Sequence, residues 1–338
     1  LGDLDLDAVV AAAVGGGNRF LPNAPFMHGA AQWIAMRQLL GGGAVVVNAV
    51  VDRLDPVEVW TTLERERCDC TLMVGEAFVR PLVTELERGR YDASSLRLVV
   101  VGGAVTSPES KARLLHALPD AIVLDAAGAS ETGTGLSAVS TRGSTTEAGV
   151  FAATPHIAVL DAELQRRLTP GDDQTGWFAK RGAIPLGYLG DRAKTERTFP
   201  VVDGERWSVP GDRARWRADG RVELLGRDSV TINTGGEKVF AEEVEAAVLT
   251  CPGIADAIVV GRPSPQWGQE VVAIVELDGT AATGAQAPPV TDEAILAAAE
   301  ARVARYKLPK AIIRVDRITR SPAGKADYRW AAEIAAQR

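Results

Sequence analysis

The first 144 residues alternate short apolar runs with longer stretches of helical periodicity. Near-continuous apolar runs predict buried strands, and a capping Asp or Ser followed by proline, as in Asp55-Pro56 and Ser107-Pro108, predicts the start of a helix. The strands are expected at residues 71–75, 96–101 and 122–125, and the helices at residues 54–66, 78–88 and 107–118. Strands of this kind separated by helices are typical of a parallel sheet covered on both faces.

The pattern changes twice along the rest of the chain. Between residues 145 and 226 the segments become short and are separated by Gly, Pro and Trp, which predicts a small antiparallel β subdomain resembling a barrel. After Arg227 a mixed pattern predicts an α+β domain. Its helices are expected at residues 241–250, 291–305 and 327–337, and its strands at residues 257–261 and 270–277. The predicted class is α/β, with a layered α/β subdomain at residues 1–144.

Composition excludes several kinds of protein. The 338 residues carry 37 Lys+Arg against 44 Asp+Glu, and this acidic balance argues against nucleic acid as a partner. The longest apolar run is far shorter than the roughly 20 residues that span a bilayer, which leaves only peripheral membrane contact open. Three cysteines are an odd count and favour a reducing compartment, the cytoplasm. Cys68 and Cys70 lack the second ligand pair that a structural zinc site needs.

Four segments carry candidate chemistry, and each also has a plain structural interpretation. Ser130 and Glu131, among the glycines of residues 128–133, offer a hydroxyl and a carboxylate that could hold Mg²⁺ on a phosphate, but also suit a solvent loop with a helix cap. Asp212 follows Gly211 in an expected tight turn, where an Asp is usually an Asx-turn residue. Gly235-Gly236 suits an ordinary turn. Lys325 suits a solvated surface charge.

The order of these segments favours a catalytic interpretation. The chain resembles the AMP-forming adenylating enzymes, which include acyl-CoA synthetases, luciferases and peptide-synthetase adenylation domains, and looks closest to the fatty and sterol-side-chain acyl-CoA synthetases of actinobacteria at residues 232–234 and 326–330. The segments that carry the resemblance are residues 25–29, 102–104, 128–132, 207–212, 226–227 with 235–239, 306–310 and 322–325.

The resemblance implies an ATP-dependent acyl-CoA synthetase that activates a small-molecule substrate, a fatty or sterol-side-chain carboxylic acid, as acyl-AMP and then transfers the acyl group to CoA. Lys325 matches the lysine that bridges carboxylate and α-phosphate, Glu131 the Mg²⁺-binding carboxylate, and His28 a position near the acyl pocket. Asp212 and Arg227 match the groups that bind the ribose. The remaining nucleotide-binding positions are Gly102, Gly103, Ala104, Gly128, Ala129 and Ser130.

The resemblance also implies the domain organisation. Residues 1–226 match the carboxyl-terminal part of the family's large domain, residues 227–230 a hinge, and residues 231–338 a small mobile domain. In the family this small domain swings, so that Gly235, Gly236 and Glu237 approach the adenylate and leave room for the pantetheine of CoA. Trp33 is a candidate wall of the acyl pocket or a core aromatic residue. The small residues Gly29, Ala30, Ala127 and Ala129 suit a bulky acid.

The sequence departs from the family at three places. Ala127 stands where an adenine-stacking aromatic residue is usual, and Ser229, beside Asp228, stands at the hinge position. No segment resembles the Ser/Thr-rich phosphate loop, because the glycines at 15–17 and 41–43 lack hydroxyls and a lysine. With Leu1 in place of an initiator Met, we expect a carboxyl-terminal fragment without pyrophosphate release of its own.

Other functions remain open on the sequence. The acyl group could pass to the phosphopantetheine of a carrier protein, or the chain could be a non-catalytic nucleotide-binding protein. A nicotinamide-binding Rossmann domain is disfavoured, because residues 99–103 lack the Gly-x-Gly-x-x-Gly turn. The sequence leaves the acid and the oligomeric state undetermined.

Overall fold

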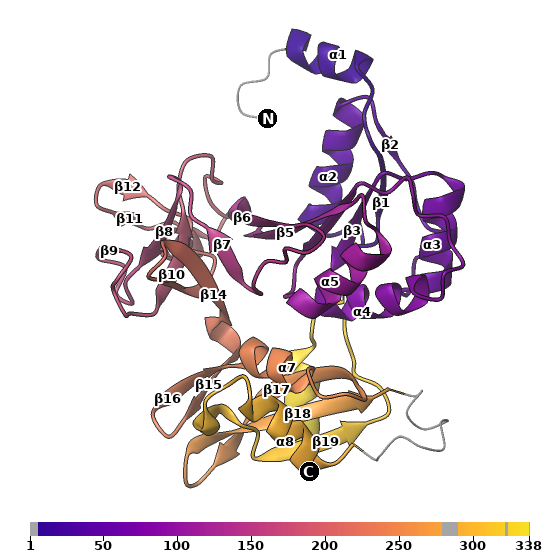
Figure 1. The fold of residues 1–338 in the computed structure, drawn as a ribbon. Helices are drawn as coiled ribbons and strands as arrows, with labels where there is room; N and C mark the ends of the chain where they lie inside the picture. The colour runs from indigo at the N-terminus through magenta and orange to yellow at the C-terminus, as the bar shows by residue number, and fades with distance from the viewer. Residues whose placement is uncertain (1–5, 279–289, 322–323, 338) are drawn as a thin grey trace.

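A computed structural model describes residues 6–278, 290–321 and 324–337. These residues form three successive units, each built on its own sheet (Figure 1). We name them the α/β unit, the β unit and the C-terminal unit. The α/β unit contains α1 (Leu6–Val14), β1 (Arg19–Pro22), α2 (Gly29–Leu40), β2 (Ala44–Val45), α3 (Pro56–Arg65), β3 (Cys70–Val74), α4 (Gly75–Leu86), β4 (Leu98–Gly102), α5 (Pro108–Ala117), β5 (Ile122–Ala129) and β6 (Gly133–Ser140).

The capping signals in the α/β unit act as predicted. The side chain of Asp55 accepts a hydrogen bond from the backbone N–H of Glu58 at the start of α3, and Ser107 does the same for Ser110 in α5. The sheet order is β2-β1-β3-β4-β5-β6. Its first five strands are parallel, which confirms the predicted α/β layer, whereas β6 is antiparallel to β5.

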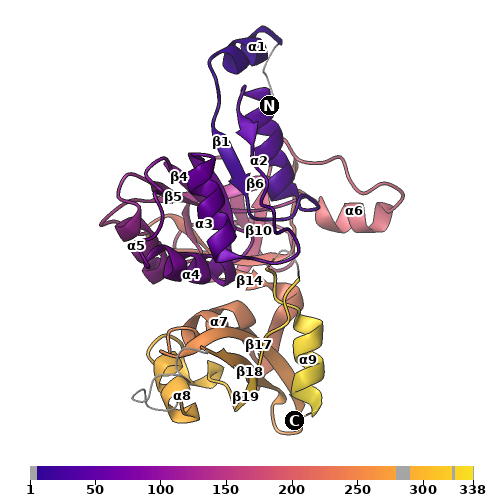
Figure 2. The ribbon, with the colours of Figure 1, turned by 90° about the vertical axis from the view of Figure 1, so that its right-hand side faces the viewer.

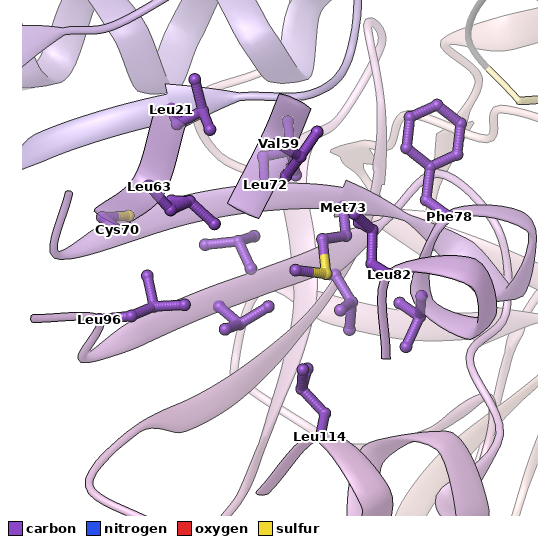
Figure 3. Close-up of a cluster of buried hydrophobic side chains, with 14 of the residues drawn as sticks. Leu21, Val59, Leu63, Cys70, Leu72, Met73, Phe78, Leu82, Leu96 and Leu114 are labelled. Carbon is purple, nitrogen blue, oxygen red and sulfur yellow. The ribbon is translucent and has the colours of Figure 1, made fainter. Parts of the chain in front are cut away.

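The largest hydrophobic core covers this sheet (Figure 3). It combines side chains of the buried strands with those of the flanking helices α3, α4 and α5. Trp60 of α3 is fully buried and donates its indole N–H to the carbonyl of Leu82 in α4 at 2.8 Å. Cys68 and Cys70 belong to the same core, and burial raises the pKa of their thiols to about 11 and about 12. Both thiols are therefore neutral core groups at physiological pH.

The β unit is antiparallel, as its Gly, Pro and Trp punctuation predicts. Six strands pair in the order β7-β14-β13-β10-β8-β9, and β11 pairs with β12. Its elements are β7 (Val150–Ala152), β8 (Ile157–Leu160), β9 (Arg167–Leu168), β10 (Gly176–Lys180), α6 (Arg192–Thr198), β11 (Val201–Val202), β12 (Glu205–Arg206), β13 (Asp212–Trp216) and β14 (Arg221–Arg227).

The C-terminal unit has the α+β composition that the sequence predicts. It begins with a 3-10 turn (Asp228–Val230) and continues with β15 (Thr231–Thr234), β16 (Glu237–Phe240), α7 (Ala241–Val248), β17 (Ile254–Ser264), β18 (Gly268–Leu277), α8 (Asp292–Glu300), a second 3-10 turn (Arg305–Lys307), β19 (Ala311–Val315) and α9 (Tyr328–Gln337). The sequence prediction missed the β15–β16 hairpin and β19, and it extended α8 to Arg305 instead of Glu300. No helix among the described residues combines the length and the apolar character needed to cross a bilayer.

Candidate active site

The parallel strands β1, β3, β4 and β5 end at one edge of the α/β sheet, where ligands of such sheets bind. His28 follows β1, Gly103 and Ala104 follow β4, and Ser130 and Glu131 follow β5. Topology therefore brings three of the predicted segments to one edge.

Close backbone packing explains the small residues after β4. A Cβ atom on Gly102 would lie 2.5 Å from the carbonyl oxygen of Ala126, and one on Gly75 would lie 2.5 Å from the Cβ of Ala104. Gly103 has a φ of +78°, in the left-handed region that glycine adopts without strain. Larger side chains at Gly102 or Gly75 would force the strand ends apart.

The segment that contains Glu131 is a hairpin, which excludes the alternative of a solvent loop with a helix cap. Gly128 and Ala129 belong to β5 and pair with Thr134 and Gly133 of β6. Thr132 is buried, and its hydroxyl accepts a hydrogen bond from the N–H of Ala129 at 2.9 Å. The turn that carries Ser130 and Glu131 is thus fixed by its own backbone.

The β unit holds Glu131 from the other side. The hydroxyl of Tyr188 donates to Oε1 of Glu131 at 2.5 Å, and the hydroxyl of Ser208 donates to its backbone carbonyl at 2.8 Å. Lys180 donates to the carbonyls of Thr132 and Thr134, and burial lowers the pKa of this lysine. Glu131 therefore lies where the two units meet, in a defined orientation.

Asp212 and Arg227 face each other across the β13–β14 ladder. They are register partners, and Nε of Arg227 lies 3.5 Å from Oδ1 of Asp212. Burial raises the pKa of Asp212 above its usual value of 3.8, and the charge of Glu131 adds to this effect, whereas Arg227 and Lys325 oppose it. Asp212 thus interacts with one charge from each of the other two units.

Lys325 reaches this group from the C-terminal unit. The loop before α9 extends from that unit to the α/β unit in both ribbon views (Figures 1 and 2). Gly324 is buried, and a Cβ atom on it would lie 2.4 Å from the ring of Phe78 in α4. Pro322 and Ala323 of the same motif lie outside the described residues. Arg227 pairs with Asp212, and the charges of Glu131 and Lys325 both act on the pKa of Asp212, so these four residues form one electrostatic group, which we call the four-charge site.

Two further carboxylates, on α7, lie behind the four-charge site. A Cβ atom on Gly226 would lie 2.7 Å from Oε2 of Glu242, and burial, followed by the charge of Asp212, raises the pKa of Glu242. Glu245 accepts the N–H of Val259 at 2.9 Å and the hydroxyl of Tyr328 at 3.4 Å. Burial raises the pKa of Glu245 to about 8.

Replacing Glu245 with glutamine should stabilise the protein increasingly as the pH rises. Between pH 4.5 and about 8 the folded state keeps a proton on Glu245 that the unfolded state has lost. Wild-type stability is therefore reduced over this interval relative to Glu245→Gln, by at most about 1.4 kcal/mol per pH unit. Denaturant unfolding at pH 5 and pH 8 measures the difference. Glu300→Gln, at an exposed position of α8, should show no such trend, and a pH-independent effect of Glu245→Gln would contradict the assignment.

The Gly235-Gly236 turn lies apart from the four-charge site. It closes the β15–β16 hairpin, with φ of +58° and +88° at the two glycines, as a two-residue hairpin turn requires. Gly235 packs against the ring of Trp267. Gly236 and Glu237 line a cavity of about 350 Å³, together with Thr175, Arg215, Leu225, Lys238, Phe240, Glu243, Tyr306 and Lys307. The hairpin and the β unit are therefore neighbours in this arrangement.

The predicted acyl-pocket residues occupy a partly exposed surface. His28 is half-buried at the start of α2, and Trp33 is 45% exposed. A Cβ atom on Gly29 would lie 2.8 Å from the Trp33 ring, so the ring fills the space that the small residue leaves. Trp33 is therefore neither a core aromatic residue nor enclosed in a cavity here.

The glycine clusters before α2 and after it pack against each other. A Cβ atom on Gly17 would lie 2.6 Å from the backbone nitrogen of Gly43, and one on Gly42 would lie 2.1 Å from the carbonyl oxygen of Ala13. Gly17, Gly42 and Gly43 therefore serve close backbone packing.

Comparison with known proteins agrees with this geometry. The model of the AMP-binding enzyme family matches residues 5–184, and that of the AMP-binding enzyme C-terminal domain matches residues 243–325. The chain belongs to the AMP-binding enzyme family. This confirms the class of protein that the sequence motifs indicate.

Two relatives of this chain have names that specify a reaction. The chain is 50% identical to the medium-chain acyl-CoA ligase Mig of Mycobacterium avium, over 97% of this chain and 58% of that protein. It is 39% identical to the 3-oxocholest-4-en-26-oate–CoA ligase of Rhodococcus rhodochrous, over 92% of this chain and 56% of that protein. The chain thus spans little more than half the length of these relatives.

Solved structures confirm the fold. The ATP-bound RpMatB–BxBclM chimera B3 matches 97% of this chain and 62% of its own, with a TM-score of 0.75 and 24% identity. The anthranilate CoA ligase AuaEII, solved with anthranoyl-AMP, matches 95% of this chain and 60% of its own, with a TM-score of 0.76 and 21% identity.

Proposed function

We propose that this protein acts as an ATP-dependent acyl-CoA synthetase that forms acyl-AMP and transfers the acyl group to CoA. The observation that carries the proposal is the four-charge site, in which Glu131, Asp212 and Lys325 come from three different units. If each residue served only the folding of its own unit, the three would have no reason to lie close together. The names of the two relatives, both CoA ligases, support the same reaction.

The first step needs cations beside the reacting atoms. A carboxylate oxygen attacks the α-phosphorus of ATP, the bond to the bridging oxygen breaks, and pyrophosphate leaves. Negative charge concentrates at the α-phosphate in the transition state, and a fixed ammonium stabilises it. Lys325 is the only one of the four charges on a segment that reaches the sheet edge from the C-terminal unit, so we assign it to the carboxylate and the α-phosphate.

The remaining predicted site residues are proposed to bind the nucleotide. A carboxylate accepts hydrogen bonds from ribose hydroxyls, and Asp212, oriented by Arg227, offers one at the start of β13. Gly102, Gly103 and Ala104 expose backbone at the sheet edge, where a planar base could approach. Gly128, Ala129 and Ser130 complete the nucleotide side in this proposal.

The donor set fits Mg²⁺ that arrives bound to ATP. No group of three or more His, Cys, Asp or Glu side chains suited to a metal occurs among the described residues, so phosphate oxygens would have to complete the coordination. Tyr188 occupies Oε1 of Glu131, while Oε2 has no hydrogen-bond or ion-pair partner in the described part of the chain. When bound, the metal ion would neutralise charge on the departing phosphates.

The second step requires CoA at the same carbonyl carbon. The thiolate attacks that carbon, and AMP leaves with the bridging oxygen. We propose that residues 227–230 form the hinge between a large domain that includes residues 1–226 and a mobile domain at residues 231–338. Its rotation would remove Lys325 and bring Gly235, Gly236 and Glu237 to the adenylate. The 3-10 turn Asp228–Val230 directly after β14 supports this hinge.

The acid is proposed from the names of the relatives. The name of the first relative supports a medium-chain fatty acid, and that of the second a sterol-side-chain acid. His28 is proposed to lie near the carboxylate of the acid. We place the reaction in the cytoplasm.

Product analysis tests this function. The natural protein is incubated with ATP, Mg²⁺, CoA and either octanoate or 3-oxocholest-4-en-26-oate, and the products are identified by mass spectrometry. We expect AMP, pyrophosphate and the acyl-CoA. Acyl-AMP that reacts only with a carrier protein's phosphopantetheine would replace CoA as the acceptor, and the absence of both acyl-CoA and acyl-AMP would refute the proposal.

A further inference from the structure

Lys325 lies on a short turn that a single arginine organises. Ser321 donates its N–H to the carbonyl of Lys325 at 2.9 Å, and Lys325 donates its own N–H to Oγ of Ser321 at 3.2 Å. Nη1 of Arg320 donates to the carbonyl of Gly324 at 3.1 Å. The backbone on both sides of Lys325 is therefore fixed.

A half-buried ion pair fixes Arg320 in turn. Its Nε and Nη2 donate to the two carboxylate oxygens of Asp256 at 2.6 Å each, and both side chains are 19% exposed. A planar guanidinium holds a carboxylate in this two-pronged way and leaves Nη1 directed at a third acceptor. Lysine, a single point charge, could not make all three contacts in fixed directions.

The strand that carries Asp256 is held by the α/β unit. Nη1 of Arg80, on α4, donates to the carbonyls of Ile254 and Ala255 at 2.9 and 3.3 Å. These are the two residues directly before Asp256. The contact thus connects the α/β unit, through the first residues of β17, to the Asp256–Arg320 ion pair that holds the backbone beside Lys325.

Arg80 also forms an ion pair within its own unit. Its Nε lies 3.9 Å from Oε1 of Glu76 one turn earlier in α4. Glu76 accepts the N–H of Ser107 at 3.0 Å and the hydroxyl of Ser110 at 2.6 Å, both at the start of α5. All of these groups belong to the α/β unit, so this ion pair does not require contact with the C-terminal unit.

We propose that Arg80, Asp256 and Arg320 are positioning residues that hold the C-terminal unit in the orientation required for adenylation and direct Lys325 into the four-charge site. The inference rests on the proposed function. Asp256 and Arg320 lie in the same unit and stay paired when that unit moves. The contact of Arg80 crosses between units and exists only in this orientation, so Arg80 should matter for adenylation and not for thioester formation.

Two half-reactions separate this role from a merely structural one. In the natural protein, Arg80→Gln should lower ATP–pyrophosphate exchange about tenfold, the loss expected for a hydrogen bond to a charged group. Its thioester formation from preformed octanoyl-AMP and CoA should stay within about twofold of wild type. Arg88→Gln, the same change at an arginine that pairs with Glu85, should leave both rates unaltered. Equal losses in both half-reactions, or no loss in either, would overturn the proposal.

A second variant tests the ion pair. Arg320→Lys keeps the positive charge but loses the two-pronged hydrogen bonding of the guanidinium group. The rate of ATP–pyrophosphate exchange should therefore again fall about tenfold or more. Thioester formation from octanoyl-AMP should persist, which a misfolded chain would not permit. Retained exchange in Arg320→Lys would exclude the ion pair from the mechanism.

A distance measurement tests the contact without any turnover. Spin labels at Glu109→Cys in α5 and Glu300→Cys in α8, both exposed positions, report the separation of the two units by pulsed electron paramagnetic resonance. We expect a narrow distribution for the 338-residue chain, a broad one with Arg80→Gln, and no change with Arg88→Gln. If Arg80→Gln leaves the distribution narrow, the proposal fails, whether or not the enzyme forms acyl-CoA. If wild type makes no acyl-AMP while the distribution broadens as expected, only the proposed function fails.

Discussion

Lys325→Ala should reduce adenylation by about 100- to 1000-fold, the effect of removing one fixed group that stabilises transition-state charge. Lys325 carries the positive charge that the C-terminal unit contributes to the four-charge site, where it opposes the burial that raises the pKa of Asp212. Its described neighbours Ser321, Gly324 and Ala326 carry no charge that could replace it. ATP–pyrophosphate exchange with octanoate in the natural protein measures the loss.

The second half-reaction provides the internal control. Because Lys325 is proposed to leave the site before CoA attacks, Lys325→Ala should form octanoyl-CoA from octanoyl-AMP within about threefold of the wild-type rate. Arg302→Ala removes one positive charge from an exposed position of the same unit and should leave exchange unchanged. A Lys325→Ala protein with normal exchange would remove this residue from the chemistry.

Asp212→Asn should weaken nucleotide binding about 10- to 100-fold, as the loss of charged hydrogen bonds predicts. The side chain lies at the start of β13 beside Arg227, and its carboxylate is the acceptor that we propose for the ribose hydroxyls. An amide retains one acceptor oxygen but loses the charge, and it turns a donor toward the sugar. Isothermal titration with AMP, applied to the 338-residue chain, measures the affinity without requiring turnover.

The raised pKa of Asp212 gives this prediction a pH dependence. Since burial shifts the pKa above 3.8, the carboxylate gains its proton at a less acidic pH than a free Asp, and AMP affinity should fall as the pH drops through that raised value. The AMP affinity of Asp212→Asn should lack this inflection. A raised pKa also means that the charged form destabilises the fold at neutral pH, so Asp212→Asn should unfold at a higher denaturant concentration there.

A control on the same hairpin separates the site from the sheet. Asp219→Asn changes an exposed carboxylate that pairs with Arg221 at the opposite end of β13 and β14. It should bind AMP with wild-type affinity. If Asp212→Asn also bound AMP normally, the proposed ribose contact would be wrong.

The sequence predicts local structure well where one strong local signal decides it. The Asp55-Pro56 and Ser107-Pro108 caps locate α3 and α5 to within a residue or two, and the apolar runs locate β3 and β4. It fails where pairing partners decide. Residues 126–129 contain Ala and Gly, which have low strand propensity, yet they extend β5 because β6 turns back beside them.

The candidate site likewise has one part that the sequence predicts and one part that it does not. Glu131, Asp212, Arg227 and Lys325 are predicted from short motifs, and the structure brings them together. The packing role of Gly102 and the hairpin around Glu131 could not be predicted, because the atoms that restrict them belong to Ala126 and β6.

The residues that the sequence analysis missed act across long separations. Tyr188 binds Glu131 from 57 positions away, and Arg80 binds the carbonyl of Ile254 from 174 positions away. Neither lies in a motif, and an arginine on an amphipathic helix normally suggests a solvated charge. Only the three-dimensional arrangement distinguishes Arg80 from Arg88 eight residues later.

The most direct test of the adenylate mechanism follows one oxygen atom. The natural protein is supplied with octanoate labelled with ¹⁸O in its carboxylate, together with ATP, Mg²⁺ and CoA, and the phosphate products are examined by mass spectrometry. If a carboxylate oxygen attacks the α-phosphorus, each AMP released carries one ¹⁸O, while pyrophosphate carries none. Label in inorganic phosphate, with ADP as the nucleotide product, would show attack at the γ-phosphorus and contradict the mechanism.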